Sequence, residues 1–83
     1  MPIFYFHVEN GHRALDEDGT DLADVAAARL EGARVLGDLL QDRPSELFET
    51  GNLRLRVADQ SGLDLFVLDL SATAAPAGFT GGR

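Results

Sequence analysis

The N-terminal part of the chain has the hydrophobic pattern of a β-hairpin. Residues 3–8 (Ile-Phe-Tyr-Phe-His-Val) are aromatic and β-branched, the residue types that favour a pleated strand. The Asn10-Gly11 pair that follows is typical of a tight hairpin turn, because both turn positions need a positive φ. We therefore expect a short return strand over residues 13–15, followed by a polar turn over residues 16–20.

The pattern changes to a helical period between Leu22 and Asp42. Thr20 or Asp21 is the expected N-cap, and Pro44 ends the helix because the residue before a proline is driven out of the α region. At about 100° per residue, the apolar residues gather on one side. This predicted face consists of Leu22, Val25, Ala26, Gly32, Ala33, Leu36, Leu39 and Leu40. A helix with one apolar face is expected to rest on a flat surface such as a sheet.

A second hairpin is predicted after the helix. Residues 45–51 form a connection with room for one helical turn at Glu46-Leu47-Phe48. Residues 53–57 (Leu-Arg-Leu-Arg-Val) alternate between apolar and basic residues, which indicates a strand with one buried and one wet face. Residues 59–62 form a turn, and residues 63–70 form a last strand whose centre is apolar on both faces.

These elements predict an α+β fold: an antiparallel four-stranded sheet, in the chain order β-β-α-β-β, with one amphipathic helix on one face. Residues 1–70 are the expected domain, because 83 residues leave room for only one. Residues 71–83 are rich in small residues and have no helical or strand period, so we expect a flexible tail.

A single helix leaves one face of this sheet uncovered. The first strand offers Tyr5 and His7 to that face, and the last strand offers either Phe66 or Leu65. An uncovered apolar face or an open edge strand favours association, and a core of this size supplies only about 3–5 kcal/mol of stability. We therefore expect a homodimer. The alternative is that the tail folds back and Phe79 covers the face.

The charge of the chain limits its partners. Seven basic residues stand against fourteen acidic ones, a net charge of −7, and no run of basic residues is present to displace counterions from nucleic acid. We expect no nucleic-acid partner and no membrane partner, because no stretch approaches the roughly 20 apolar residues of a membrane span. A partner steered by charge is expected to be a basic protein. The lack of cysteine excludes disulfides and thiolate sites and fits a cytoplasmic location.

Two histidines, His7 and His12, are the first candidates for site chemistry. If the hairpin pairs around Asn10-Gly11, they lie close to one another across the two strands, where Glu9 or Asp16 would add a metal ligand. A zinc site needs three or four ligands, however, and this arrangement has two certain donors. We expect two surface-facing residues, with no metal and no cofactor.

The acidic residues between Asp16 and Asp24 do not fit a calcium loop. An EF-hand aligned on Gly19 would place its first ligand at Ala14 and its closing glutamate at Val25. A solvated turn with favourable negative charge near a helix N-terminus is the better interpretation.

Arg29 falls inside the predicted apolar arc of the helix, where a charge must be paired or must reach the edge. It is either an anion anchor that faces the sheet near Tyr5 or His7, or a structural residue whose stem packs while its head is paired or in water. The cost of burying a charge favours the structural role. The candidate binding residues are therefore Tyr5, His7, His12 and Arg29.

The chain offers little for catalysis. Ser45, Ser61 and Ser71 lie in predicted turns or at the start of the tail, and none stands in a Gly-x-Ser-x-Gly elbow. The glycines form neither a dinucleotide-binding fingerprint nor a P-loop. A domain of this size also has little depth for an apolar pocket. We expect no enzymatic activity and assign no catalytic residue.

Several short motifs resemble a family of short, uncharacterised bacterial proteins that carries a domain of unknown function. These motifs are the opening Met-Pro-Ile-Phe-Tyr-Phe-His-Val, the acidic turn ending Asp18-Gly19-Thr20, the helix start Leu22-Ala23-Asp24 with Ala27-Ala28-Arg29, and the late Val57-x-Asp59-x-x-Gly62 hairpin. The resemblance covers roughly residues 1–70. It implies a small intracellular domain and assigns no activity.

The hairpin, the acidic turn and the alanine-rich helix are also similar to the N-terminal domain of HicB-type antitoxins. Against this, the helix follows the first hairpin and its turn at once, which leaves no room for a third strand, and no separate DNA-binding segment is present.

Three hypotheses follow. The first is a non-enzymatic interaction or self-association module that uses the uncovered sheet face or an edge strand. The alternatives are an antitoxin-like module that masks a basic protein, and a small-ligand or metal-binding domain.

Overall fold

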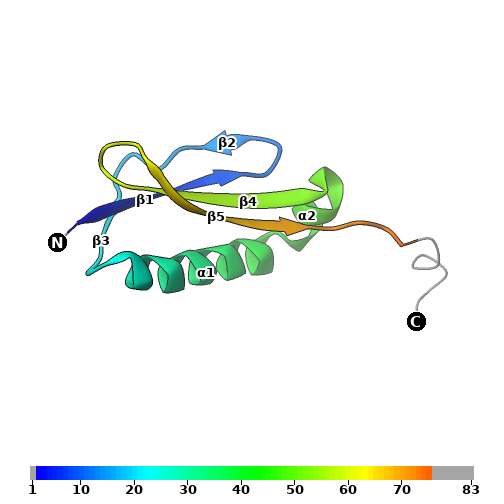
Figure 1. Ribbon diagram of the computed structural model, residues 1–83. Coiled ribbons are helices and arrows are strands. Elements are labelled where there is room, and N and C mark those ends of the chain that lie inside the picture. Colours follow the sequence, from blue (N-terminus) through cyan, green and yellow to red (C-terminus); the bar gives the residue numbers. More distant parts are fainter. Residues whose placement is uncertain (1, 76–83) are drawn as a thin grey trace.

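The computed structural model describes residues 2–75, which form an antiparallel sheet with a long helix on one face and a short helix at one end of the sheet (Figure 1). The elements in chain order are β1 (Ile3–Glu9), β2 (Arg13–Ala14), β3 (Thr20–Asp21), α1 (Val25–Asp42), α2 (Pro44–Thr50), β4 (Asn52–Ala58) and β5 (Asp64–Ser71). The strand order is β2-β1-β4-β5, and β3 also pairs with β1. The α+β class is confirmed, but the sheet has five strands where four were predicted, and a second helix follows the first.

The short strands β2 and β3 are two pieces of one interrupted strand along the outer edge of β1. Ala14 of β2 pairs with Val8, and Thr20 of β3 pairs with Phe4. The segment between them bulges away from the ladder, and its end is fixed by Gly19 at a φ of +78°, where a methyl group would collide with Ile3. The prediction that no third strand fits before the helix is therefore wrong.

Helix α1 starts at Val25, because Asp24 is its N-cap. The Asp24 backbone is extended, with a φ of −163°, and its carboxylate accepts a hydrogen bond of 2.8 Å from the N–H of Ala27. The predicted caps were wrong for a long-range reason: Thr20 and Asp21 are paired to β1. The predicted end is confirmed, since α1 stops at Asp42 and Pro44 takes the first turn of α2, a position that tolerates proline.

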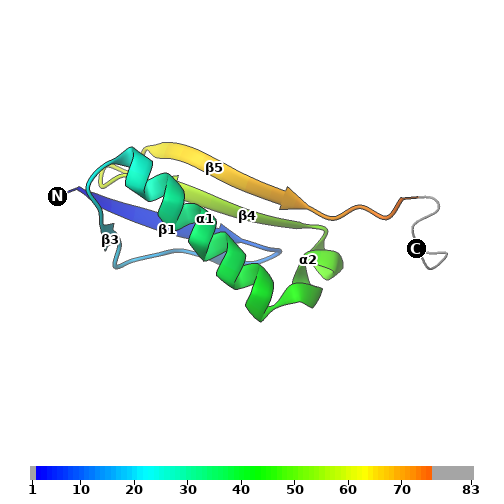
Figure 2. The ribbon, with the colours of Figure 1, turned by 90° about the horizontal axis from the view of Figure 1, so that it is seen from below.

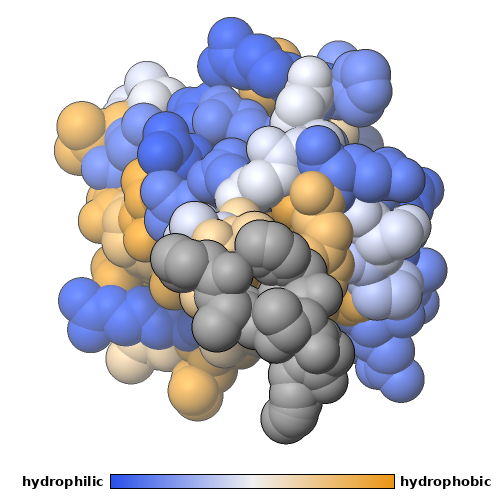
Figure 3. Space-filling view, turned by 90° about the vertical axis from the view of Figure 1, so that its right-hand side faces the viewer, coloured by the Kyte–Doolittle hydropathy of each residue, from blue (hydrophilic) through white to orange (hydrophobic). Residues whose placement is uncertain are grey.

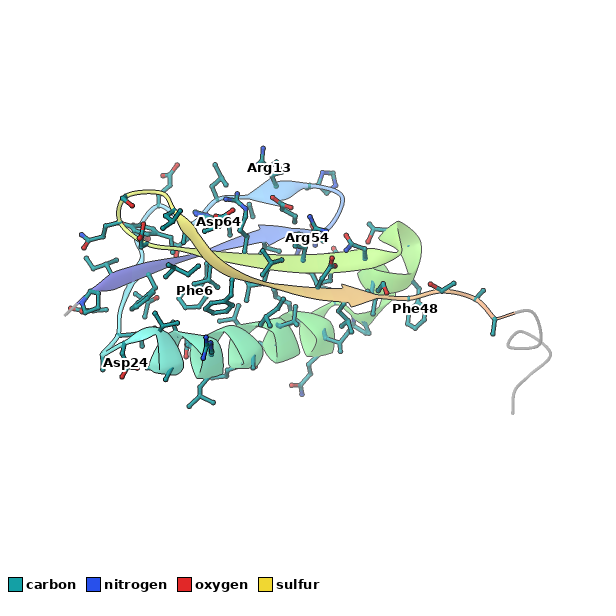
Figure 4. The ribbon with its side chains drawn as sticks, viewed as in Figure 1. Phe6, Arg13, Asp24, Phe48, Arg54 and Asp64 are labelled. Atoms are coloured by element: carbon teal, nitrogen blue, oxygen red, sulfur yellow. The ribbon has the colours of Figure 1, made fainter. Side chains whose placement is uncertain are left out.

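The core lies between α1 and the sheet. Its buried residues are Phe4, Phe6, Ala28, Leu55 and Val57. Leu47 of α2 and Leu53 at the start of β4 are also buried. Figure 4 shows Phe6 pointing from β1 toward the helix. The apolar face of α1 is rotated from the predicted one: Ala28 and Gly32 are buried, whereas Val25, Ala26 and Ala33 are exposed.

Helix α1 crosses the sheet diagonally (Figure 2). Its N-terminal half lies near β5, and its C-terminal half runs toward the side of β1 and α2. In residues 2–75 neither helix is long and apolar enough to cross a membrane. The predicted boundary at residue 70 falls next to the end of β5 at Ser71, while the proposed covering role of Phe79 lies outside the described residues.

Candidate interaction surface

The sheet face opposite α1 is charged rather than apolar. The strand register sets Glu9, Arg54 and Asp69 side by side across β1, β4 and β5. Arg54 contacts Asp69 at 2.8 Å, and Arg56 contacts Glu9 at 3.5 Å and Asp64 at 3.0 Å. Figure 4 shows Arg54 and Asp64 on the side of the sheet away from the helix. Because these charges satisfy one another, this face does not require an apolar cover.

Tyr5 and His7 lie together on this open face, as the sequence predicts. Their rings are stacked, with centroids 6.4 Å apart and an angle of 11° between the planes. The β5 residue that shares the face is Val67, which pairs with Arg56. The expected Phe66 and Leu65 both pack against the buried core instead, and a register shift between Val57 and Ala58 accompanies this arrangement.

Asp16 closes the bulge between β2 and β3, and sequence reasoning did not assign it this role. Its Oδ2 accepts a hydrogen bond from the N–H of Phe6 at 3.1 Å, and its Oδ1 accepts from Asp18 and Gly19, each at 3.1 Å. Its own N–H donates to Nδ1 of His7 at 3.0 Å. Burial raises the pKa of Asp16, but the three backbone donors outweigh that effect, so its pKa lies below the ordinary value. The sequence signal for this role of Asp16 is the Asp-x-Asp-Gly turn over residues 16–19.

His12 stands apart from His7. The hairpin loop spans residues 10–12 with only Gly11 at a positive φ, so His12 lies in the turn and not in the ladder. It is exposed and lines a shallow pocket of about 330 Å³ between the hairpin and the junction of α1 with α2. Within residues 2–75 no three metal-ligating side chains gather. Of the candidate binding residues, the structure brings Tyr5 and His7 together and leaves His12 in the turn.

Arg29 is exposed on α1, so its predicted place inside the apolar face is wrong. It is also the one arginine of residues 2–75 with no carboxylate within ion-pair distance. At 100° per residue, Arg29 lies on the flank of α1 that also carries Val25, Ala33, Leu36 and Leu40. We call these five residues the α1 flank. The opposite flank carries Glu31, Asp38 and Asp42, and Arg34 on the same side pairs with the first two.

The α1 flank faces the β5 side of the molecule. Asp42 lies on the opposite flank and lines the hairpin pocket together with Val8, which places that flank toward β1 and β2. The α1 flank must then point toward β5. Beside it, Leu30 is 75% exposed on the outer surface of the helix. Figure 3 shows hydrophobic residues gathered at the left and hydrophilic residues at the top and right. The left of Figure 3 is the front of Figure 1, where β5 passes in front of β4.

Strand β5 is an edge strand whose outer backbone groups pair with nothing in the described part of the chain. The N–H of Ala72 donates to the carbonyl of Gly51 at 3.0 Å, which fixes the phase of the β4–β5 ladder. Antiparallel ladders alternate, so Phe66 and Leu68 direct their backbone groups to β4, whereas Val67 and Asp69 direct theirs outward. The outer edge of β5 thus offers free hydrogen-bonding groups beside the apolar α1 flank.

The two edges of the sheet differ in their protection. The β1 edge is covered by two short strands and the charged side chain of Asp16. The β5 edge is eight residues long, contains neither lysine nor proline, and has apolar side chains at most positions; its two charged residues, Asp64 and Asp69, are paired with Arg56 and Arg54 of β4. Natural proteins guard exposed edges with short strands, inward charges, lysine or proline. The β1 edge is therefore the better guarded of the two.

Together these features define a small α+β domain with one guarded and one open sheet edge. The family model described as Domain of unknown function (DUF6894) matches residues 3–71, and the chain belongs to this family, which confirms the resemblance expected from the sequence. No curated protein matches the chain, and no solved structure does.

Proposed function

We propose that this chain is a non-enzymatic protein-interaction module that binds its partner by strand addition at the outer edge of β5. The observation that carries the proposal is the unpaired backbone of Val67 and Asp69 beside the apolar α1 flank. Added strands gain affinity from main-chain hydrogen bonds and specificity from alternate side chains. Val67, which is 45% exposed, and the half-buried Phe66 and Leu68 provide such side chains on the two faces.

Site-specific photocrosslinking in the native host tests this proposal. A photoreactive residue at Leu30, next to the α1 flank, is expected to give a defined protein adduct. The same residue at Leu15, beyond β2, is the control, since Leu15 is also exposed, at 58%. The Leu30 adduct must depend on the backbone N–H of Val67. It is expected to disappear with Val67→Pro, which removes only an outward N–H, and to persist with Val67→Thr. Equal adducts at both positions, or insensitivity to Val67→Pro, would contradict the proposal.

A regulatory module that masks a basic protein is a second candidate. It is favoured by the net charge of −7 and by β3, which removes the topological objection to an antitoxin-like fold. Association with a basic partner is expected to weaken as salt rises, because screening reduces the attraction between opposite charges. A partner adduct whose yield is independent of ionic strength would argue against this candidate.

A further inference from the structure

We infer that the partner at this surface is a second copy of the chain. In this arrangement β5 pairs antiparallel with its own copy about a two-fold axis beside Val67, and the two α1 helices meet across the same axis. The inference rests on the proposed function, because it uses the same edge, and it adds the identity of the partner and the register of the contact.

The position of α1 over the sheet fits this arrangement. A methyl group at Gly32 would lie 3.4 Å from side-chain carbons of Phe66 and Leu68 on β5 and 3.6 Å from Leu55 on β4. At Gly32 the helix therefore passes above the boundary between β4 and β5. Neighbouring strands are about 4.8 Å apart, so the helix lies about one strand spacing from an axis midway between β5 and its copy. The two helices are then separated by about 9–10 Å, a normal packing distance for helices.

The register of the pairing follows from charge and from the position of the helix. An axis at Asp69 would set two carboxylates directly opposite one another, which is unfavourable. An axis at Val67 pairs this half-exposed valine with its copy and sets Phe66 opposite Leu68 of the second copy. Gly32 stands above Phe66 and Leu68, so the helices also cross at the level of Val67. A single two-fold axis at Val67 therefore pairs the two β5 edges and also brings the two α1 flanks into contact.

The charge distribution favours contact on this side of a chain with a net charge of −7. The α1 flank contains Arg29 and no carboxylate, whereas the opposite flank contains three carboxylates, of which Arg34 pairs with Glu31 and Asp38 and leaves a net negative charge. Small Ala33 allows close approach at the crossing, and the stem of Arg29 covers apolar surface while its head stays in water. Repulsion between the acidic bodies of two copies remains, so added salt is expected to strengthen the dimer.

Sedimentation velocity of the purified chain over a range of concentrations tests the inference. Wild type is expected to form a dimer of twice the 8.9 kDa chain mass, and more of it at higher salt. Ala33→Glu is the informative variant, because Ala33 is exposed and the monomer is expected to stay folded by circular dichroism. It places two carboxylates at the helix crossing and is expected to raise the dissociation constant about tenfold or more. Val67→Pro, which removes an outward N–H, is expected to have the same effect.

Ala14→Glu is the matched control, since Ala14 is exposed on β2 at the opposite edge, and it is expected to leave the dimer unchanged. A wild type that remains monomeric at millimolar concentration would overturn the inference. So would a dimer that tolerates Ala33→Glu, or one that salt dissociates. A host adduct at Leu30 with a different protein, combined with a monomeric purified chain, would overturn the second copy as partner and leave strand addition at β5 standing.

Discussion

Replacing Asp16 by asparagine tests whether this side chain holds the guarded edge of the sheet. The carboxylate accepts hydrogen bonds from the N–H groups of Phe6, Asp18 and Gly19, each at 3.1 Å. The amide oxygen of asparagine can still accept the two turn donors, but its NH₂ group would then face the N–H of Phe6. Phe6 is 9% exposed and its hydrogen bond to Asp16 is partly buried, so water replaces the lost acceptor only in part. A buried donor left unsatisfied costs about 1–3 kcal/mol, which is the destabilisation we expect at neutral pH.

The pH dependence of this effect has a definite sign. In the unfolded chain Asp16 titrates at its ordinary pKa of 3.8, and in the folded chain its pKa is lower. Burial opposes this lowering, and the N–H groups of Gly19, Phe6 and Asp18 cause it. The stability contributed by the ionised group is therefore fully present above the unfolded pKa and is lost as pH falls through the folded pKa. Asparagine does not titrate, so the difference between wild type and Asp16→Asn should shrink below pH 3.8.

Urea denaturation followed by circular dichroism measures this difference at neutral and at acidic pH, with linear extrapolation to water. Comparing the two proteins at each pH removes the contribution of the other carboxylates, which titrate in both. Equal stability at neutral pH would refute the role assigned to Asp16. A difference that persists unchanged under acidic conditions would show that the charge of Asp16 is not its source.

Two further substitutions test the packing and the start of α1. Gly32→Ala is expected to stabilise the fold by about 0.5–1 kcal/mol, because the added methyl meets Phe66 and Leu68 no closer than 3.4 Å and the helix loses a glycine. Gly32→Leu is expected to cost about 1–3 kcal/mol by overpacking the same site. Asp24→Ala is expected to cost about 1 kcal/mol through loss of the 2.8 Å N-cap hydrogen bond, while Asp24→Asn keeps an acceptor and stays close to wild type. Thermal or urea unfolding measures the stability of each variant. The geometry at Gly32 would be contradicted if Gly32→Ala destabilised the fold. The N-cap role of Asp24 would be contradicted if Asp24→Ala and Asp24→Asn had the same stability.

Local chemistry made the three long strands and the end of α1 predictable. The predicted strands over residues 3–8, 53–57 and 63–70 lie within one residue of the observed bounds at every end, because alternation and turn residues act over short distances. The start of α1 was not predictable in the same way. Thr20 has the chemistry of a cap, yet its backbone pairs with Phe4, a residue far away in the sequence.

The helix face shows a second limit. Alanine and glycine are neutral in a hydrophobic pattern, so the pattern of α1 does not distinguish Ala28 and Gly32, which are buried, from Ala26 and Ala33, which are exposed. The placement of Arg29 inside the apolar face failed for this reason. The rotation of α1 about its own axis is decided by its close approach to the sheet. A small residue such as Gly32 is needed where the helix backbone meets the side chains of the strands.

By itself the sequence determined that this chain is an acidic α+β domain of antiparallel hairpins around a long helix, and that one sheet face would carry Tyr5 and His7. Those conclusions follow from residue types and short-range periodicity. Only the tertiary structure decided that the open face is a set of ion pairs, that Asp16 closes one edge, and that the outer backbone groups of β5 lie unpaired beside the α1 flank in the described residues. The reason is that charge pairing, edge protection and helix rotation depend on which strands become neighbours, and neighbours are set by contacts between distant parts of the chain.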